Sequence, residues 1–165
     1  MIEPQDISRL KEILEELKKR SENGAVIIVE GPSDITSLRA LGIKGEIVTS
    51  SNTPDAVLVD EVGKEDIIIL TDCDRRGDVM EKSLWNKFSS WGVTPNTEFK
   101  KRIFSVLKEI HEIEDLARYL EKAREELDLK GILLIELDLL LELPEMRSGA
   151  LFQTIPLCSF LLLDL

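Results

Sequence analysis

Two short apolar runs, each followed at once by acidic residues, constrain the fold of this chain more than any other feature. Residues 25–29 (AVIIV) lead into Glu30, and residues 66–70 (DIIIL) lead into the segment TDCD that holds Asp72 and Asp74. Both runs are rich in β-branched residues and lack polar alternation, which is typical of parallel strands that are buried on both faces. Because parallel strands need long crossover connections, helices are expected between them.

Helical patterns surround these two runs. Apolar residues recur at helical spacing from Ile7 to Leu17, and Asn23-Gly24 ends that helix. Further helices are predicted over residues 32–41, 56–62, 79–91, 97–108 and 113–127, and weaker strands over residues 46–49 and from Val93. The order predicts an α/β fold, a three-layer sandwich with a central, mostly parallel sheet of about four strands between helices.

The length of 165 residues fits one domain, which we expect over residues 1–130 with its core at about 24–127. Residues 131–165 form a leucine-rich tail, which we expect to pack on the core, on a partner protein or on a second copy in a homodimer. No secretory signal is present, and the uncharged stretch 148–163 is shorter than a membrane span. With only two cysteines far apart, a cytoplasmic protein with no membrane association is expected.

The charge balance restricts how the chain can meet a polyanion. With 21 Lys+Arg against 32 Asp+Glu, the formal net charge is −11. This charge excludes a broadly basic nucleic-acid binder, because the protein as a whole would repel phosphates. Any phosphate site must therefore be local or must carry a metal ion.

Glu30, Asp72 and Asp74 are the residues most able to form such a site. The carboxyl ends of neighbouring parallel strands meet at one edge of the sheet, where open α/β sheets bind ligands. Residues two apart in an extended segment face the same side, so Asp72 and Asp74 can converge with Glu30. An all-oxygen donor set favours Mg²⁺, or Mn²⁺, with no organic cofactor.

Several neighbouring residues can assist at this edge. Glu30 is the predicted acid/base group, while Arg75 and Arg76 are candidates for clamping a phosphate, with pairing to Asp78 or Glu81 as the alternative. Gly77 would allow a close backbone approach. Asp34 can assist in the site or stabilise a helix start through the helix dipole.

Val29-Glu30-Gly31 with Ser33-Asp34, followed by Asp72-Cys73-Asp74 and Gly77, resembles the Toprim domain, and the resemblance extends over residues 24–127. It is closest to the small stand-alone Toprim proteins of archaea and bacteria. The resemblance implies a Rossmann-like fold, with Glu30 in acid/base catalysis and at the metal, and with Asp72 and Asp74 as Mg²⁺ ligands. The resemblance implies one or two ions. Many members carry a third acidic residue where this chain has Arg76, and this departure speaks against a full two-metal site.

Toprim domains occur in topoisomerases, primases, nucleases and an RNA maturase. The chain has no room for the further domains of a topoisomerase or a primase, so the resemblance implies a small nuclease or processing factor that acts on phosphodiester bonds of RNA or DNA. The alternative is a non-catalytic module that binds nucleic acid or a protein in a metal-dependent way. A phosphoacceptor domain also fits the α/β class, but this chain lacks the residue pattern that is usual in such domains.

Two further groups of residues have structural explanations. The cluster Lys100-Lys101-Arg102 is expected on a solvated helix face. Trp85, Phe88 and Trp91 have the helical spacing of core residues, which we favour over a role as a base-stacking surface.

Overall fold

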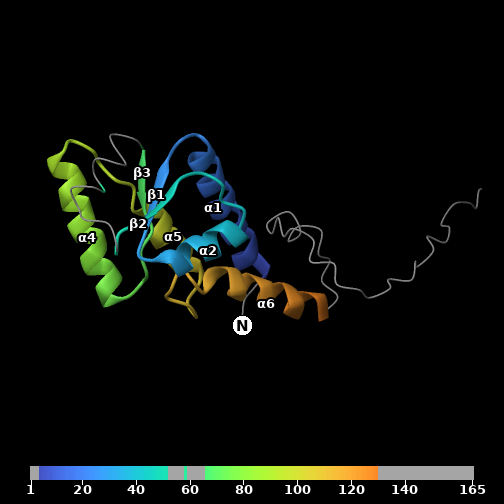
Figure 1. Cartoon of the computed structure of the whole chain (residues 1–165). Helices are drawn as coiled ribbons and strands as arrows, with labels where there is room; N and C mark the ends of the chain where they lie inside the picture. The colour runs from blue at the N-terminus through green and yellow to red at the C-terminus, as the bar shows by residue number, and fades with distance from the viewer. Residues whose placement is uncertain (1–3, 52–57, 59–65, 130–165) are drawn as a thin grey trace, which may run out of the picture.

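The computed structural model describes residues 4–51, 58 and 66–129, and these form an α/β fold (Figure 1). Its elements are α1 (Pro4–Glu22), β1 (Val26–Val29), α2 (Pro32–Ala40), β2 (Ile47–Thr49), β3 (Ile67–Ile69), α4 (Arg75–Ser90), α5 (Glu98–Val106) and α6 (Leu116–Leu129). In this part of the chain, no helix has the length and hydropathy that crossing a bilayer requires. Of the helix expected over 56–62 only residue 58 is described, and the tail 131–165 lies outside the described residues.

The strands form an open parallel sheet in the order β2-β1-β3. The described residues contain three strands, where the sequence predicted about four. In place of the strand expected from Val93, Asn96 makes a single parallel bridge to Ile68, with its N–H bonded to the Ile67 carbonyl. The helix α5 begins at Glu98, two residues after this bridge, so the chain leaves the sheet there.

The two faces of the sheet are covered unequally. Alternate residues of β1 and β3, such as Ile28 and Ile69, pack against Leu84 and Phe88 of α4. The opposite residues, such as Ile27 and Ile68, belong to a larger core that also takes in α1, α2, α5 and α6. Figure 1 shows α4 on one side of the sheet and these four helices on the other.

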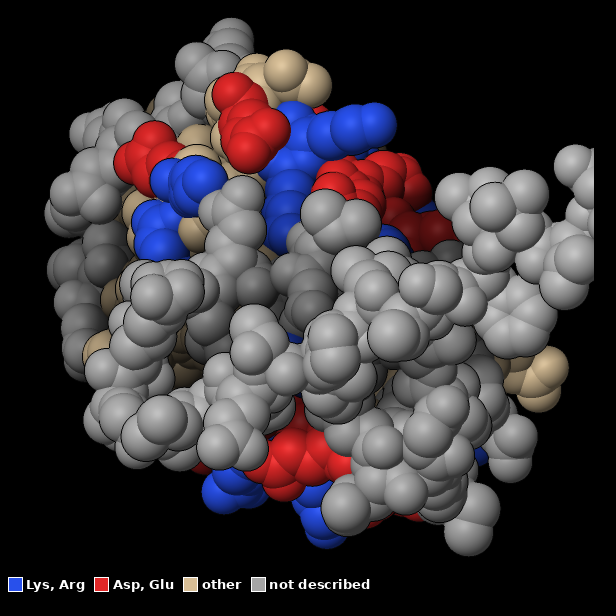
Figure 2. All heavy atoms as spheres, turned by 90° about the vertical axis from the view of Figure 1, so that its right-hand side faces the viewer, with Lys and Arg blue, Asp and Glu red and all other residues tan. Residues whose placement is uncertain are grey.

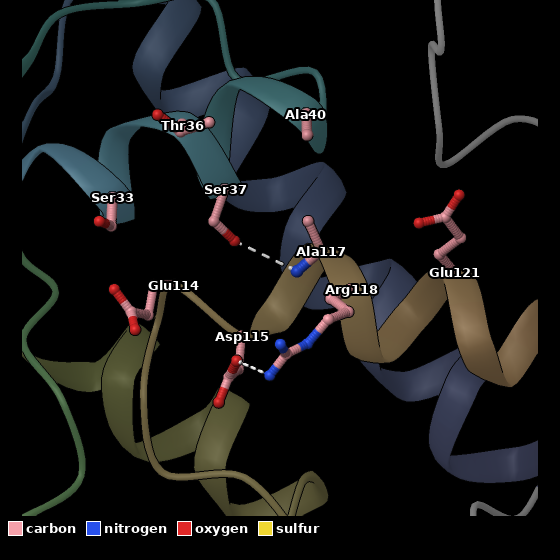
Figure 3. A pocket seen from close by; sticks show the side chains of 9 residues that line it. All are labelled: Ser33, Thr36, Ser37, Ala40, Glu114, Asp115, Ala117, Arg118 and Glu121. Atoms are coloured by element: carbon pink, nitrogen blue, oxygen red, sulfur yellow. Dashed lines mark hydrogen bonds and ion pairs between the residues drawn. The ribbon is translucent and has the colours of Figure 1, made fainter.

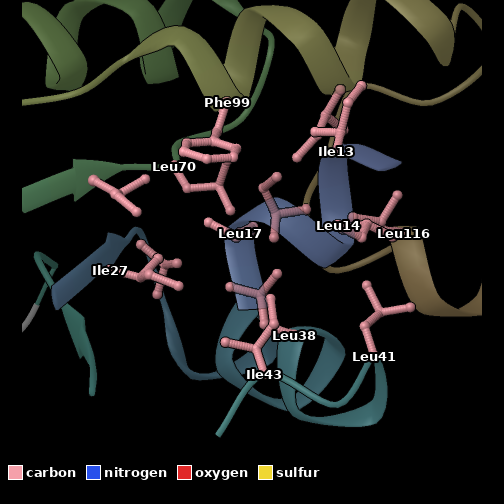
Figure 4. Packing of buried hydrophobic residues seen from close by; sticks show 14 of the residues in the cluster. Ile13, Leu14, Leu17, Ile27, Leu38, Leu41, Ile43, Leu70, Phe99 and Leu116 are labelled. Carbon is pink, nitrogen blue, oxygen red and sulfur yellow. The ribbon is translucent and has the colours of Figure 1, made fainter. Parts of the chain in front are cut away.

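The larger core explains why the N-terminal helix forms. Leu10, Leu14 and Leu17 are fully buried, and α1 places them against the sheet and against Phe99 of α5 (Figure 4). At about 1.5–3 kcal/mol for a fully buried leucine side chain, this stripe supplies the stability that helical propensity alone does not. The helix ends where predicted, at Gly24, whose φ of 97° favours glycine.

Two expectations for the helices are wrong. Residues 107–115 are not helical, so α5 ends at Val106 and α6 begins at Leu116. In α4, Phe88 is buried as expected, but Trp85 and Trp91 are 41% and 58% exposed. Leu84, Phe88 and the partly buried Met80 are the residues of α4 in the described part of the small core, and the two tryptophans lie outside it.

Candidate functional site

Glu30 and Asp72 follow the carboxyl ends of the paired strands β1 and β3. Ile28 pairs with Ile69 in the sheet, so Glu30 lies two residues beyond this pair and Asp72 three. The Glu30 Oε1 atom accepts a hydrogen bond of 3.3 Å from the Asp72 N–H. The parallel register therefore brings these two residues together across 42 positions of sequence.

The two aspartates of the motif are each held by one backbone hydrogen bond. Asp72 Oδ1 accepts from the Ile113 N–H at 2.8 Å, and Asp74 Oδ1 accepts from the Gly77 N–H at 2.6 Å. The second bond makes Asp74 the N-cap of α4. In the described structure no hydrogen bond engages the second oxygen of either carboxylate, which leaves one oxygen on each for a ligand.

The acidic side chains influence one another electrostatically. Burial raises the pKa of Glu30, the charges of Asp72 and Asp74 raise it further, and the Asp72 N–H and Arg76 act in the opposite direction. Burial also raises the pKa of Asp72, with Asp74 adding to the effect and the Ile113 N–H and Lys100 opposing it. Both carboxylates thus carry a cost of ionisation that a bound cation would relieve.

Gly77 is buried in the first turn of α4, directly against the site. A Cβ atom at this position would lie 2.1 Å from the Asp72 carbonyl oxygen and 3.0 Å from Glu30 Oε1. The sequence predicted a close approach at Gly77, and the close neighbours in the structure are the Asp72 backbone and the Glu30 side chain. Any side chain here would separate the helix from the end of β3.

The two arginines at the start of α4 do not pair with Asp78 or Glu81. The Arg76 Nε atom lies 3.9 Å from Glu30 Oε2, and the Arg76 side chain is 75% exposed. Arg75 is exposed and makes no hydrogen bond or ion pair with the described residues. Both are free to meet an anion that approaches the site from solvent.

Asp34 lies at the start of α2, where it closes the turn after Glu30. Its Oδ2 atom accepts a 2.9 Å hydrogen bond from the Gly31 N–H, the residue that caps the helix. Burial raises the pKa of Asp34, and the Asp72 and Glu114 charges raise it further, whereas the bond from Gly31 lowers it. The helix-start role expected for Asp34 is present, and the side chain also lies within electrostatic range of Asp72.

Lys100 is the residue of this region whose role the sequence did not indicate. It was expected on a solvated face, but its side chain is 5% exposed, and its Nζ atom lies 2.8 Å from Asp78, 2.9 Å from Glu81 and 3.2 Å from Thr71 Oγ1. Burial, the largest influence, lowers the pKa of Lys100, but hydrogen bonds and charge attraction from Asp78 and Glu81 raise it above its ordinary value. Lys100 therefore joins α5 to α4 and to the residue that precedes Asp72.

The loop between α5 and α6 completes the site, and the sequence assigned most of it to helices. The His111 carbonyl accepts a hydrogen bond from the Cys73 N–H at 2.7 Å, and the Ile113 N–H donates to Asp72. Glu114 adds negative charge near Asp72 and Asp34. Backbone hydrogen bonds leave no pattern in side-chain chemistry, so no sequence signal could have assigned this loop to the site.

The donor set suits a hard divalent cation. Among residues 4–51, 58 and 66–129, no three His, Cys, Asp or Glu side chains lie close enough to share one ion. Mg²⁺ usually binds one or two carboxylates and keeps several waters, so it does not need a closed protein cage. Glu30 with Asp72 or Asp74, together with waters, fits that requirement, because the charges of both aspartates raise the pKa of Glu30 and the charge of Asp74 raises the pKa of Asp72.

A cavity of about 430 Å³ lies beside the carboxylates, between α2 and the start of α6 (Figure 3). Ser33, Ser37, Glu114, Asp115 and Arg118 are among its lining residues. The Arg118 guanidinium is engaged by Asp115, and Ser37 Oγ accepts from the Ala117 N–H at 3.2 Å. With its only cation paired to a carboxylate, this cavity is poorly suited to phosphate.

Charge is mixed on the face of the molecule seen in Figure 2. Acidic and basic side chains of the described residues are interspersed there and do not separate by sign. Such a face offers a polyanion no extended positive field. A contact with phosphate would depend on a few local cations, as the composition predicted.

Comparisons with known proteins agree with this geometry. The model of the Toprim domain matches residues 25–107, the stretch from β1 through α5 that carries Glu30, Asp72 and Asp74. A UPF0292 protein of Archaeoglobus fulgidus is 42% identical over 119 residues, which are 72% of this chain and 94% of the relative. A UPF0292 protein of Methanocaldococcus jannaschii is 36% identical over 118 residues, 69% of this chain and 91% of the relative. A solved protein structure from Aquifex aeolicus matches with a TM-score of 0.56 and 32% identity, covering 63% of this chain and 94% of that one.

Proposed function

Because this chain belongs to the Toprim domain family, we propose that it is a Mg²⁺-dependent nuclease or processing factor that cleaves phosphodiester bonds of RNA or DNA. The proposal rests above all on Glu30 and Asp72, which meet at the ends of adjacent parallel strands and each have a raised pKa. Perturbed carboxylates gathered at a strand edge are typical of functional sites in open α/β sheets. The family is related to nucleic acids and to divalent metals, which agrees with this chemistry.

Each carboxylate has a distinct role in the proposal. Glu30 with Asp72 or Asp74 holds the metal through free carboxylate oxygens, and waters complete the coordination, since no three acidic side chains of the described residues lie close enough to share one ion. A bound Mg²⁺, or Mn²⁺, as one ion or two, would polarise a phosphoryl oxygen and balance developing negative charge. Glu30 moves the proton of the reacting oxygen, a task that suits a carboxyl group whose pKa lies above its ordinary value of 4.5.

The cations around the carboxylates position the substrate. Arg75 and Arg76 offer planar donors to the phosphate next to the scissile bond. When Arg76 turns to the phosphate, it leaves Glu30, and the loss of this cation raises the pKa of Glu30 further. Asp34 secures the turn that carries Glu30 through its hydrogen bond to Gly31.

The first test is calorimetric titration with Mg²⁺ and Mn²⁺, followed in the same buffer by incubation with single-stranded and duplex RNA and DNA. We expect metal binding and cleavage in the wild type and loss of both in the Asp72→Asn/Asp74→Asn double variant. Glu30→Gln should abolish cleavage while keeping at least part of the metal binding. Asp66→Asn is the matched control, since it removes a carboxylate at the opposite end of β3. Cleavage that persists in the double variant contradicts the proposal.

A second function is favoured by the 3.9 Å approach of Arg76 to Glu30. An acid/base group that remains paired with a guanidinium is less able to exchange a proton, and the chain would then bind nucleic acid through the metal without cleaving it. Fluorescence anisotropy with a labelled oligonucleotide separates the two functions. Metal-dependent binding without cleavage in the wild type and in Arg76→Gln would support the binding module.

A further inference from the structure

The solvent side of α4 combines exposed apolar and cationic residues, and we call Arg75, Val79, Lys82 and Trp85 its outer face. Val79 is 66% exposed and Trp85 is 41% exposed. At about 100° per residue, these four positions fall within an arc of about 120° on the helix. Tryptophan side chains are usually more buried than this in folded proteins, because the ring carries a large apolar area.

The Trp85 ring is not required by the described core. Leu84 and Phe88 supply the contribution of α4 to the cluster against β1 and β3, and Trp85 is not a member of it. The helical spacing of Trp85, Phe88 and Trp91 suggested three core residues, but only Phe88 is fully buried. The Trp85 ring is therefore open to a ligand.

The charge of the outer face runs against that of the chain. Neither Arg75 nor Lys82 forms a hydrogen bond or ion pair with another residue of the described structure. Asp78 lies within the same arc, and its exposed side chain is bound by Lys100 at 2.8 Å. In a protein of net charge −11, two exposed cations that have no partner among the described residues form, beside an aromatic ring, a local site for an anion with an aromatic part.

The outer face leads directly to the carboxylates. Asp74 caps α4, and Arg76 in the first turn reaches Glu30. From Arg75 to Trp85 the helix rises about 15 Å, a length that several nucleotides can span. A strand whose phosphate lies at Glu30 can thus continue along α4.

We propose that the outer face of α4 binds single-stranded nucleic acid and guides it to the carboxylate site, an inference that rests on the proposed function. Arg75 and Lys82 contact phosphates, and Trp85 stacks on a base. Val79 packs against the nucleic-acid strand between these contacts. Stacking requires an unpaired base, because the bases of a duplex present only their edges. The substrate class is therefore single-stranded RNA or DNA, or a single-stranded end.

The test uses the Asp72→Asn/Asp74→Asn background, so that labelled oligo(U) and oligo(dT) stay intact during anisotropy titrations. We expect Trp85→Ala to weaken binding about tenfold and Trp85→Phe to restore most of it. Trp91→Ala is the matched control, because Trp91 is 58% exposed but lies about 120° around the helix from Trp85. Equal affinity of the Trp85→Ala and Trp91→Ala variants would overturn the proposal.

A second measurement follows the cations through salt. Arg75→Gln and Lys82→Gln should each reduce the slope of log K against log salt by about 0.7, the value for one phosphate of a single strand. Lys101→Gln is the control, since Lys101 is 63% exposed and lies on α5, across the sheet. Unchanged slopes in both α4 variants, or tighter binding of duplex than of single strands, would contradict this surface.

Fluorescence gives a direct readout, because the chain has only two tryptophans. In a Trp91→Phe variant all tryptophan emission comes from Trp85, and we expect oligo(dT) to quench it. The result is independent of cleavage: quenching without cleavage in a protein with intact carboxylates would retain the outer face and reject the nuclease. Cleavage without quenching would retain the nuclease and reject the outer face.

Discussion

Strand β3 carries an aspartate near each end, and the two have different surroundings. Asp66, before the strand, forms an exposed ion pair with Arg20 at 2.5 Å. Asp72, after the strand, is partly buried, its side chain accepts a hydrogen bond from Ile113, and its N–H donates to Glu30, with Asp74 and Glu114 raising its pKa. An aspartate side chain is therefore neutralised by a cation at one end of β3, and another is left among anions at the other end.

The difference shows that the fold places repulsion between carboxylates at the Asp72 end of β3. The Asp66 pair is solvated and contributes little to stability, as exposed ion pairs do. At the Asp72 end, Gly77, Lys100 and the loop 107–115 hold the carboxylates in place despite their repulsion. Such an arrangement is expected where a ligand supplies the missing positive charge.

The largest predicted effect comes from Gly77→Ala, which disrupts the packing at the Asp72 end of β3 and leaves the Asp66 end unchanged. The new Cβ atom would lie 2.1 Å from the Asp72 carbonyl, so α4 must move away from β3. We expect a loss of about 3 kcal/mol in the free energy of unfolding in urea, together with loss of Mg²⁺ binding. Gly31→Ala is the control, since nothing lies within 4 Å of its Cβ position and its φ of −144° suits alanine. Equal stability of the two variants would show that this contact does not hold the site.

Lys100→Met should have the next largest effect. It leaves Glu81 and Thr71 without their buried partner, and the free energy of unfolding should fall by about 2 kcal/mol. Lys101→Met, which removes only an exposed pair with Glu98, should cost at most about 0.5 kcal/mol. Chemical denaturation of both proteins gives the comparison, and a Lys100 variant as stable as the Lys101 variant would refute the role of Lys100.

Substitution of the two aspartates should shift stability in opposite directions. In metal-free buffer at pH 7, Asp72→Asn removes repulsion while Asn Oδ1 still accepts from Ile113, so the free energy of unfolding should rise by about 0.5 kcal/mol. Asp66→Asn weakens the pair with Arg20 and should lower it by about 0.5 kcal/mol. Added Mg²⁺ should stabilise the wild type and the Asp66 variant more than the Asp72 variant. A shift of the same sign in both variants would contradict the comparison.

The smallest expected effect concerns pH. Glu30, Asp34 and Asp72 have pKa values above their ordinary values of 4.5, 3.8 and 3.8. The folded state therefore binds more protons than the unfolded state between the ordinary and the raised values, and their contribution to stability falls as the pH rises through the raised values. The difference in unfolding free energy between wild type and Asp72→Asn should favour the wild type increasingly as the pH is lowered from 7 toward 3.8, the ordinary value for Asp72, by a few tenths of a kcal/mol. A difference that stays constant over this range would exclude the raised pKa of Asp72.

Much of the fold could be predicted from residue patterns. The apolar runs located β1 and β3, the leucine stripe located α1, and Gly24 and Gly42 ended helices with φ values of 97° and 83°. The expected fourth strand is reduced to a bridge at Asn96, and α5 begins two residues later. The two C-terminal helices were predicted too long, since apolar residues such as Ile113 are buried from within a loop.

Exposure along α4 and α5 could not be predicted in the same way. Trp85 has the spacing of a core residue but lies outside the described core, and Lys100 has the composition of a solvated face but is buried. Helical periodicity fixes which residues share a side of a helix, but neighbouring elements decide how much of that side they cover. How much of a helix side is covered depends on contacts between segments far apart in the chain.

The sequence by itself determined the α/β class, the two central strands and the carboxylates at their ends, because local periodicity and β-branched composition depend on neighbouring residues only. The tertiary structure alone decided that Ile113 would anchor Asp72, that Lys100 would bind Thr71, and that Trp85 would remain exposed. These outcomes depend on how helices and loops pack across the sheet, where backbone groups and buried charges find partners that no local pattern specifies.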